Sequence, residues 1–294
     1  MPPIPLTYIS EPPGERDLFV AKYGVQFTPT LWLRSIATSG SEKVRAMEVY
    51  VVPPPDNTES VLLTGQYRGA PGAVNPNFPD AGGQSDPFVM KFNGDGDLLW
   101  ARGFTNIDDN GSGTGTALAL DVLGNVYVAG KMTGMTRFSE QPEHMIDSAG
   151  DSDAFVVMLE PDGNIGWVRR FGEKGRTNEA TGIAVDDEYV YVTGSFQGTL
   201  DLDDPATGTE TLTAESDVDL FLLKLDRQNG KVVCSARFAQ GGPSAQVRVV
   251  AKGSGQVTLA GSWGSSPLDF GSGPLAPVGG LDVFLAKFNE TLVQ

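Results

Sequence analysis

Acidic side chains are the groups of this chain with the most chemical potential. Asp and Glu number 37 against 21 Lys and Arg, so the formal net charge is −16 at pH 7. The densest acidic run lies between Gln197 and Asp219, and it contains no Lys or Arg. Clustered carboxylates suit a cationic partner or Ca²⁺, although they can also serve only as a solvated surface. The candidate binding residues of this run are Asp201, Asp203, Asp204, Glu210, Glu215 and Asp217.

A second set of carboxylates suggests a calcium site. Asn106 opens the run Asn-Ile-Asp-Asp-Asn-Gly, which fits the first half of an acidic Ca²⁺ loop, but Ala117 stands where such a loop ends in a bidentate Glu. The competing interpretation is that these Asp residues cap backbone N–H groups in turns, and the sequence favours it. We therefore expect either no cofactor or Ca²⁺. The candidate metal ligands are Asp108, Asp147 and Asp151.

Enzyme signatures are sparse. The chain has no nucleophile elbow and no Walker loop, and a His pair is excluded because His144 is the only histidine. A single cysteine, Cys234, excludes an intramolecular disulfide and is expected to be a buried packing residue. Carboxylate pairs are plentiful, so a carbohydrate-active enzyme that uses acidic loop residues stays open as an alternative. The sequence favours binding over catalysis.

Composition excludes several partners. A strongly acidic chain lacks the basic footprint that nucleic-acid or anionic membrane binding needs. No stretch approaches the length of an apolar membrane span, and residues 1–10 lack the basic and apolar regions of a secretory signal.

The elements that must position these carboxylates come from an internal repeat. Asp-x-Phe recurs five times, with successive Asp residues 69, 67, 66 and 63 apart, and a period this regular indicates a repeat architecture. A Trp follows the Asp at a nearly constant distance in the first three repeats, and a Cys takes its place in the fourth, which implies a core position. The repeats begin near Asp17, Asp86, Asp153, Asp219 and Asp282, and the following positions are Trp32, Trp100, Trp167 and Cys234.

Each repeat predicts four short strands. In the third repeat, residues 155–159 and 165–171 flank the turn Pro-Asp-Gly-Asn, and residues 181–185 and 189–193 are rich in β-branched and aromatic residues. Neither hairpin can bury both of its faces alone, so the copies must stack. We predict an all-β fold, a β-propeller of four-stranded blades, with residues 1–294 as a single domain.

The motif Asp-x-Phe-Val-x-Lys, a Gly turn, Trp and Gly-Asn-Val-Tyr-Val-Ala-Gly resembles the bacterial β-propeller repeat called the SBBP repeat. The chain departs from it at Met158, where Lys is usual, and at Cys234, where Trp is usual. The resemblance implies a β-propeller in a bacterial extracellular or cell-surface protein. It implies little about activity, because such folds host many functions.

Counting strands predicts four repeat-derived blades and one extra edge strand. If residues 181–185 and their equivalents are innermost, the two termini share a blade, with residues 31–36 as its outermost strand. Residues 18–23 and 283–288 then compete for one place. The strand left over would be an edge strand available for a homo-oligomer contact.

The long connections are expected on one face. In a four-stranded meander the second-to-third and blade-to-blade connections share one side, and here these are residues 130–155, 194–221 and 104–117. Long loops on a rigid scaffold are where recognition usually resides. We therefore expect a non-catalytic recognition or scaffold module that presents an acidic long-loop face to a protein or glycan partner. Trp263 is the candidate stacking ring, and a calcium-dependent adhesion module is a further alternative.

Overall fold

The computed structural model describes residues 17–24, 30–36, 38–52, 55–56, 58–69, 81, 84–108, 110–148, 151–173, 175–202, 211–238, 246–252, 256–264 and 267–288. Nearly all regular structure in these residues is antiparallel β-strand. The one helical element among them is a single 3₁₀ turn, η1 (Pro142–His144). The predicted all-β class is confirmed.

Three four-stranded sheets follow one another along the chain. Sheet A contains β3 (Lys43–Val51), β4 (Glu59–Tyr67), β5 (Asp86–Asn93) and β6 (Leu98–Gly103). Sheet B contains β8 (Ser112–Leu120), β9 (Val126–Thr133), β12 (Asp153–Leu159) and β13 (Ile165–Phe171). Sheet C contains β14 (Glu179–Val185), β15 (Tyr189–Phe196), β18 (Asp219–Asp226) and β19 (Val232–Phe238). Each sheet joins the second hairpin of one repeat to the first hairpin of the next, as predicted.

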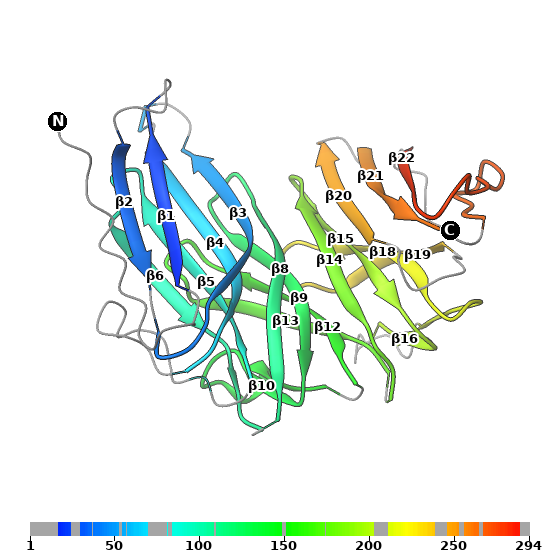
Figure 1. Cartoon of the computed structure of the whole chain (residues 1–294), viewed down its shortest axis with the longest axis horizontal. Helices are drawn as coiled ribbons and strands as arrows, with labels where there is room; N and C mark the ends of the chain where they lie inside the picture. The colour runs from blue at the N-terminus through cyan, green and yellow to red at the C-terminus, as the bar shows by residue number, and fades with distance from the viewer. Residues whose placement is uncertain are drawn as a thin grey trace.

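Shorter sheets stand at the two ends of this row, which Figure 1 shows as a curved array. Sheet D has three strands, β20 (Gln246–Lys252), β21 (Gln256–Trp263) and β22 (Asp282–Phe288). The N-terminal hairpin has two, β1 (Leu18–Tyr23) and β2 (Thr30–Ile36). The expectation that residues 31–36 complete the last sheet is therefore wrong, because β2 pairs with β1 and packs on sheet A, while β22 takes the third place beside β21.

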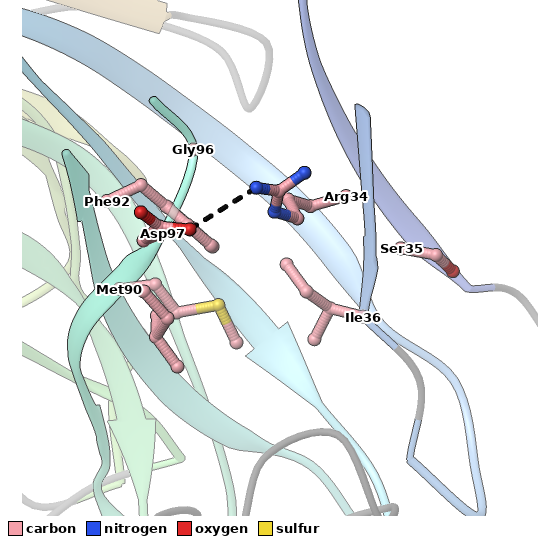
Figure 2. Close-up of a pocket in the computed structure, with 8 residues that line it drawn as sticks. Arg34, Ser35, Ile36, Met90, Phe92, Gly96 and Asp97 are labelled. Atoms are coloured by element: carbon pink, nitrogen blue, oxygen red, sulfur yellow. Dashed lines mark hydrogen bonds and ion pairs between the residues drawn. The ribbon is translucent and has the colours of Figure 1, made fainter. Parts of the chain in front are cut away.

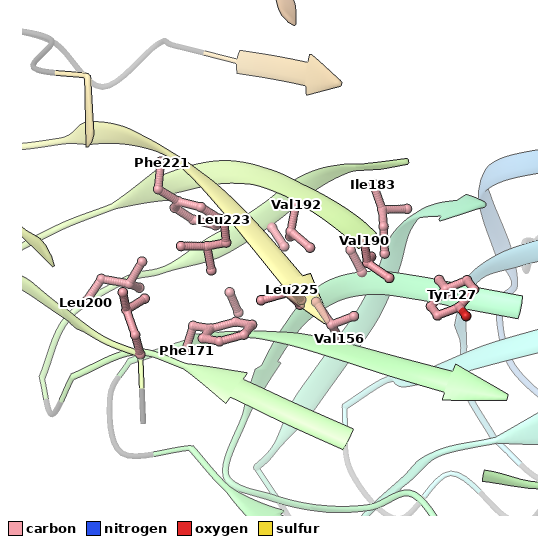
Figure 3. Packing of buried hydrophobic residues seen from close by; sticks show 14 of the residues in the cluster. Tyr127, Val156, Phe171, Ile183, Val190, Val192, Leu200, Phe221, Leu223 and Leu225 are labelled. Atoms are coloured by element: carbon pink, nitrogen blue, oxygen red, sulfur yellow. The ribbon is translucent and has the colours of Figure 1, made fainter. Parts of the chain in front are cut away.

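Consecutive sheets pack face to face by one rule. Along β12, Ala154 and Val156 point towards sheet C, where they share a buried cluster with Phe221 and its neighbours (Figure 3). The alternate residues Phe155 and Val157 point the other way and share a cluster with sheet A. All four β12 side chains are fully buried. Because strand side chains alternate between faces, one third strand serves two interfaces.

A glycine lies opposite the phenylalanine of each third strand. Gly130 pairs with Phe155, and Gly194 pairs with Phe221. A Cβ atom on Gly130 would lie 2.6 Å from the Phe155 ring and 2.1 Å from the carbonyl oxygen of Thr114. Glycine is needed here because the ring lies across the neighbouring backbone.

The repeated Trp residues join each sheet to the next. Trp100 Nε1 donates to the carbonyl oxygen of Pro161 at 2.9 Å, and its ring lies against Gly163 in the same turn. Gly163 has φ 84°, so this turn uses the left-handed backbone that the Asp-Gly sequence predicts. Trp32 and Trp167 bond in the same way to the carbonyls of Gly94 and Arg227.

The two ends of the sheets differ. At one end, which we call the long-connection face, second-to-third connections meet sheet-to-sheet connections: Gly113 N donates to Ser85 O at 2.7 Å, and Asn178 N donates to Ser152 O at 2.8 Å. At the other end, the short-turn face, tight turns close the hairpins. The predicted separation of long and short connections is present in the residues that the structure describes.

Candidate functional site

The long-connection face has secondary structure of its own. Strands β7 (Thr105–Asn106), β10 (Met135–Arg137) and β11 (Met145–Asp147) form a three-stranded sheet, and β16 (Thr199–Asp201) pairs with β17 (Thr211–Thr213). Buried side chains anchor these small sheets in the main cores, among them Phe138 and Leu200. The loops are therefore held in place by packing.

The Asp at the start of each third strand binds the backbone of the long connections. Asp86, Asp153 and Asp219 are fully buried. Asp86 accepts from the backbone N–H of Asn106 at 3.0 Å, and Asp219 accepts from the N–H of Glu215 at 2.8 Å. Recurring Asp residues of this kind orient the long connections, which is the structural role that the sequence favoured.

Two arginines neutralise two of these buried carboxylates. Arg170 Nη1 lies 2.8 Å from Asp153 Oδ2, and Arg237 Nη1 lies 3.0 Å from Asp219 Oδ2. Arg237 also pairs with Glu215 at 2.5 Å, and these two carboxylates together raise its pKa above the ordinary value. Part of the acidic cluster is therefore compensated, which lowers the negative charge expected from the sequence.

The structure separates the predicted binding residues. Asp201 is half-buried at the end of β16, whereas Glu215 and Asp217 are exposed on the connection before β18. Asp203, Asp204 and Glu210 lie outside the described residues.

The expectation that Trp263 lies on a binding surface is wrong, because its side chain is buried. Its side chain is 6 % exposed in the core of sheet D, and its ring centroid lies 6.1 Å from that of Phe284. Phe196, at the equivalent position at the end of β15, is also buried, so this position belongs to the apolar core of each sheet. Cys234 was expected to be buried, but it is only partly buried.

The three candidate metal ligands have separate roles. Asp108 Oδ2 accepts from the backbone N–H of Met135 at 2.7 Å, so this carboxylate caps a turn. Asp147 is exposed at the end of β11, and Asp151 donates its backbone N–H to Arg176 O. Among the residues that the structure describes, no three Asp, Glu, His or Cys side chains are grouped as metal ligands would be.

A small cavity lies between the N-terminal hairpin and sheet A. Its volume is about 170 Å³, and its walls include Ile36, Met90 and Phe92, with the Arg34–Asp97 ion pair at its edge (Figure 2). Ligand pockets usually reach ~300 Å³ or more, so the cavity suits a packing gap better than a substrate.

An unusual carboxylate lies beside Asp17. Glu42 is 5 % exposed, accepts from Thr38 N at 3.0 Å, and burial together with the charge of Asp17 raises its pKa to about 7. Its Oε2 and Asp17 Oδ2 have no hydrogen-bond partner among the described residues. The sequence contained a signal that we missed: Ser35 occupies the register position of Arg170 and Arg237, so Asp17 lacks their cation.

The short-turn face is tied together by side chains. Tyr127 and Tyr191 donate to Asp121 and Asp186, each at 3.0 Å, and burial beside these carboxylates raises the pKa of both phenols. Arg227 of sheet C lies 3.6 Å from Asp121 of sheet B. These contacts use the polar groups of this face for structure.

Comparisons with known proteins add little. No protein family matches the chain, and no curated protein matches it. Among solved structures, the chain is similar to a subtype N10 neuraminidase-like protein of A/little yellow-shouldered bat/Guatemala/060/2010, at 9 % identity and a TM-score of 0.32, over 74 % of this chain and 76 % of that one. A likeness at this level carries no argument. Within the described residues, no helix has the length and apolarity to span a membrane.

Proposed function

We propose that this chain is a non-catalytic recognition or scaffold module of the β-propeller type, in which sheets A to D are blades and the long-connection face binds a protein or glycan partner. The observation that carries the proposal is the difference between the two faces. Exposed carboxylates lie on both faces, but the long-connection face also carries small sheets that are anchored in the core, whereas the short-turn face closes its hairpins with short turns whose Asp side chains bind Tyr127 and Tyr191.

Charge indicates the class of partner. Asp147, Asp151 and Asp217 are exposed on this face, and the whole chain is strongly acidic. Such a surface attracts a basic partner and repels an acidic one. An extracellular or cell-surface location fits this use and is part of the proposal, on the strength of the SBBP resemblance.

Calcium as a bridge is the second candidate, favoured by the exposure of Asp147 and Asp151 in one connection. The enzyme alternative has no comparable observation among the described residues. Of the carboxylates that the structure describes, Glu42 is the one whose pKa is clearly raised, and at 5 % exposure it is screened from a substrate.

The test compares two triple variants with the same change in charge. Asp147→Asn, Asp151→Asn and Asp217→Asn alter the long-connection face, while Asp95→Asn, Asp187→Asn and Glu160→Gln alter exposed residues of the short-turn face. Binding to an immobilised lysine-rich peptide and to a glycan panel is measured with and without CaCl₂.

We expect the first triple variant to weaken binding about tenfold, which corresponds to ~1.4 kcal/mol, and the second to leave it unchanged. A calcium requirement that disappears in the first variant would identify the bridged form. Equal weakening by both variants would show attraction by net charge alone, and no binding by the wild-type protein would refute the proposal.

A further inference from the structure

The hairpin β1–β2 leaves one of its faces uncovered. Phe19 of β1 is 66 % exposed and Tyr23 is 49 % exposed, although Leu18 and Val20 on the opposite face are buried against sheet A. The other repeats bury the equivalent phenylalanine completely or nearly so, with 0 % exposure for Phe88, Phe155 and Phe221 and 3 % for Phe284. The face of Phe19 is therefore the side of a third strand that normally contacts a preceding sheet.

Sheet D leaves the opposite kind of face uncovered. Val283 and Leu285 of β22 are 84 % and 77 % exposed. Their equivalents in sheet C, Leu220 and Leu222, are 0 % and 5 % exposed because they contact the following sheet. Val283 and Leu285 are neighbours on one face of the strand, at positions that sheet C buries. Exposed apolar side chains in such an arrangement mark an interaction surface rather than ordinary surface residues.

These two faces are the two halves of one kind of contact. Between sheets C and D, Leu220 and Leu222 share a cluster with Phe284 and Phe288. Counted from the Asp that opens each repeat, Val283 and Leu285 occupy the positions of Leu220 and Leu222. Phe19 and Tyr23 occupy the positions of Phe284 and Phe288. The same pairing of positions joins all four pairs of neighbouring sheets, from the hairpin to sheet D.

We propose that a second copy of this chain docks head to tail, with the Phe19 and Tyr23 face of its hairpin on the Val283 and Leu285 face of sheet D. The two faces lie at opposite ends of the array, separated by sheets A, B and C (Figure 1). Each copy therefore offers one face of each kind. Such a contact is heterologous, so it builds rings or open chains of copies rather than symmetric pairs.

The proposal is independent of the acidic face, and its first test is mass in solution. Sedimentation velocity over a wide concentration range should show species above the 31.2 kDa of one chain, with a mass that rises with concentration. Phe19→Asp and Leu285→Asp should each reduce the protein to single chains, because each variant lacks one of the two faces in every copy.

Mixing supplies the decisive arm. Each single variant keeps one intact face, so an equimolar mixture of the two should restore a two-chain species that neither forms alone. Met47→Glu is the matched control: Met47 is 58 % exposed on β3 near the hairpin but lies outside both faces, so its replacement should leave association unchanged.

Three results would overturn the proposal. One is a wild-type protein that is monomeric at every concentration. The second is a mixture that stays monomeric although both variants fold by circular dichroism. The third is a melting temperature that falls in Phe19→Asp and Leu285→Asp but not in Met47→Glu while the wild type stays monomeric, since that would show that the chain's own sheet D covers the hairpin.

Discussion

Strands β12 and β1 carry closely related sequences and have different fates. Both follow the Asp-x-Phe pattern, yet β12 pairs with strands on both edges, while among the described residues β1 pairs only with β2. Phe155 is fully buried between sheets A and B, and Phe19 is 66 % exposed. The repeat pattern therefore specifies a strand and its two faces, while the number of neighbouring sheets decides how much each face stabilises the fold.

The largest expected effect sharpens this comparison directly. Phe155→Ala should lower the free energy of unfolding by about 3–5 kcal/mol, because it empties a packed site between two sheets. Phe19→Ala should change it by about 0.5 kcal/mol or less, as expected for an exposed side chain. Urea denaturation of both variants below the concentration of association measures the difference. Similar losses for both would contradict the exposure of β1.

Buried ion pairs give the next effect. Arg237→Met leaves Asp219, which is fully buried, without its cation, and should cost about 3 kcal/mol. Arg34→Met removes a half-exposed pair with Asp97 and should cost less than about 1 kcal/mol. Thermal unfolding monitored by circular dichroism compares them. If Arg34→Met loses as much stability as Arg237→Met, then ion pairs of the terminal hairpin stabilise the fold as much as buried ion pairs of the inner sheets do.

Glu42 gives a smaller effect that depends on pH. Burial raises its pKa from 4.5 to about 7, so the folded state keeps a proton that the unfolded chain loses in this range. Its contribution to stability is full below pH 4.5 and is lost as the pH rises to about 7. Glu42→Gln should therefore match the wild type near pH 4 and exceed it by on the order of 2 kcal/mol at pH 8.

The control for this prediction is Glu48→Gln, since Glu48 is exposed on the strand that follows Glu42. Urea midpoints between pH 4 and pH 8 should change equally for this control and the wild type. In the third repeat the neutral Asn178 occupies the register position of Glu42, so no comparable dependence is expected there. An identical pH dependence of stability in the wild type and in Glu42→Gln would show that Glu42 ionises normally.

Much of the fold could be predicted because its signals are local. Alternating apolar residues and the Asp-Gly turns identify β12 and β13 nearly to the residue. The offset between repeats and sheets follows from the order of short and long connections. The single-domain organisation stays a prediction. The blade shared by the two termini was wrong, because it depends on contacts between the ends of the chain, which no local pattern encodes.

The candidate site was harder to predict because side-chain roles depend on neighbours far apart in sequence. Asp108 caps the backbone of Met135, and Glu215 pairs with Arg237, although the sequence shows all of them only as polar residues near turns. Trp263 was misplaced because the spacing of an aromatic residue does not say whether the next sheet covers it. The charge of the long-connection face could be predicted in sign but not in strength.

Hydrogen exchange within the unmodified protein tests most directly the claim that neighbouring sheets decide the fate of the repeat strand. The strand β12 has paired neighbours on both edges, so its amides should exchange only through the largest openings. Within the part of the chain that the structure describes, β1 pairs with β2 alone, so its amides should exchange much sooner. At low protein concentration, we predict protection of residues 154–158 at least about a hundredfold greater than that of residues 18–22, which corresponds to ~2.7 kcal/mol. Equal protection of the two segments would contradict the account.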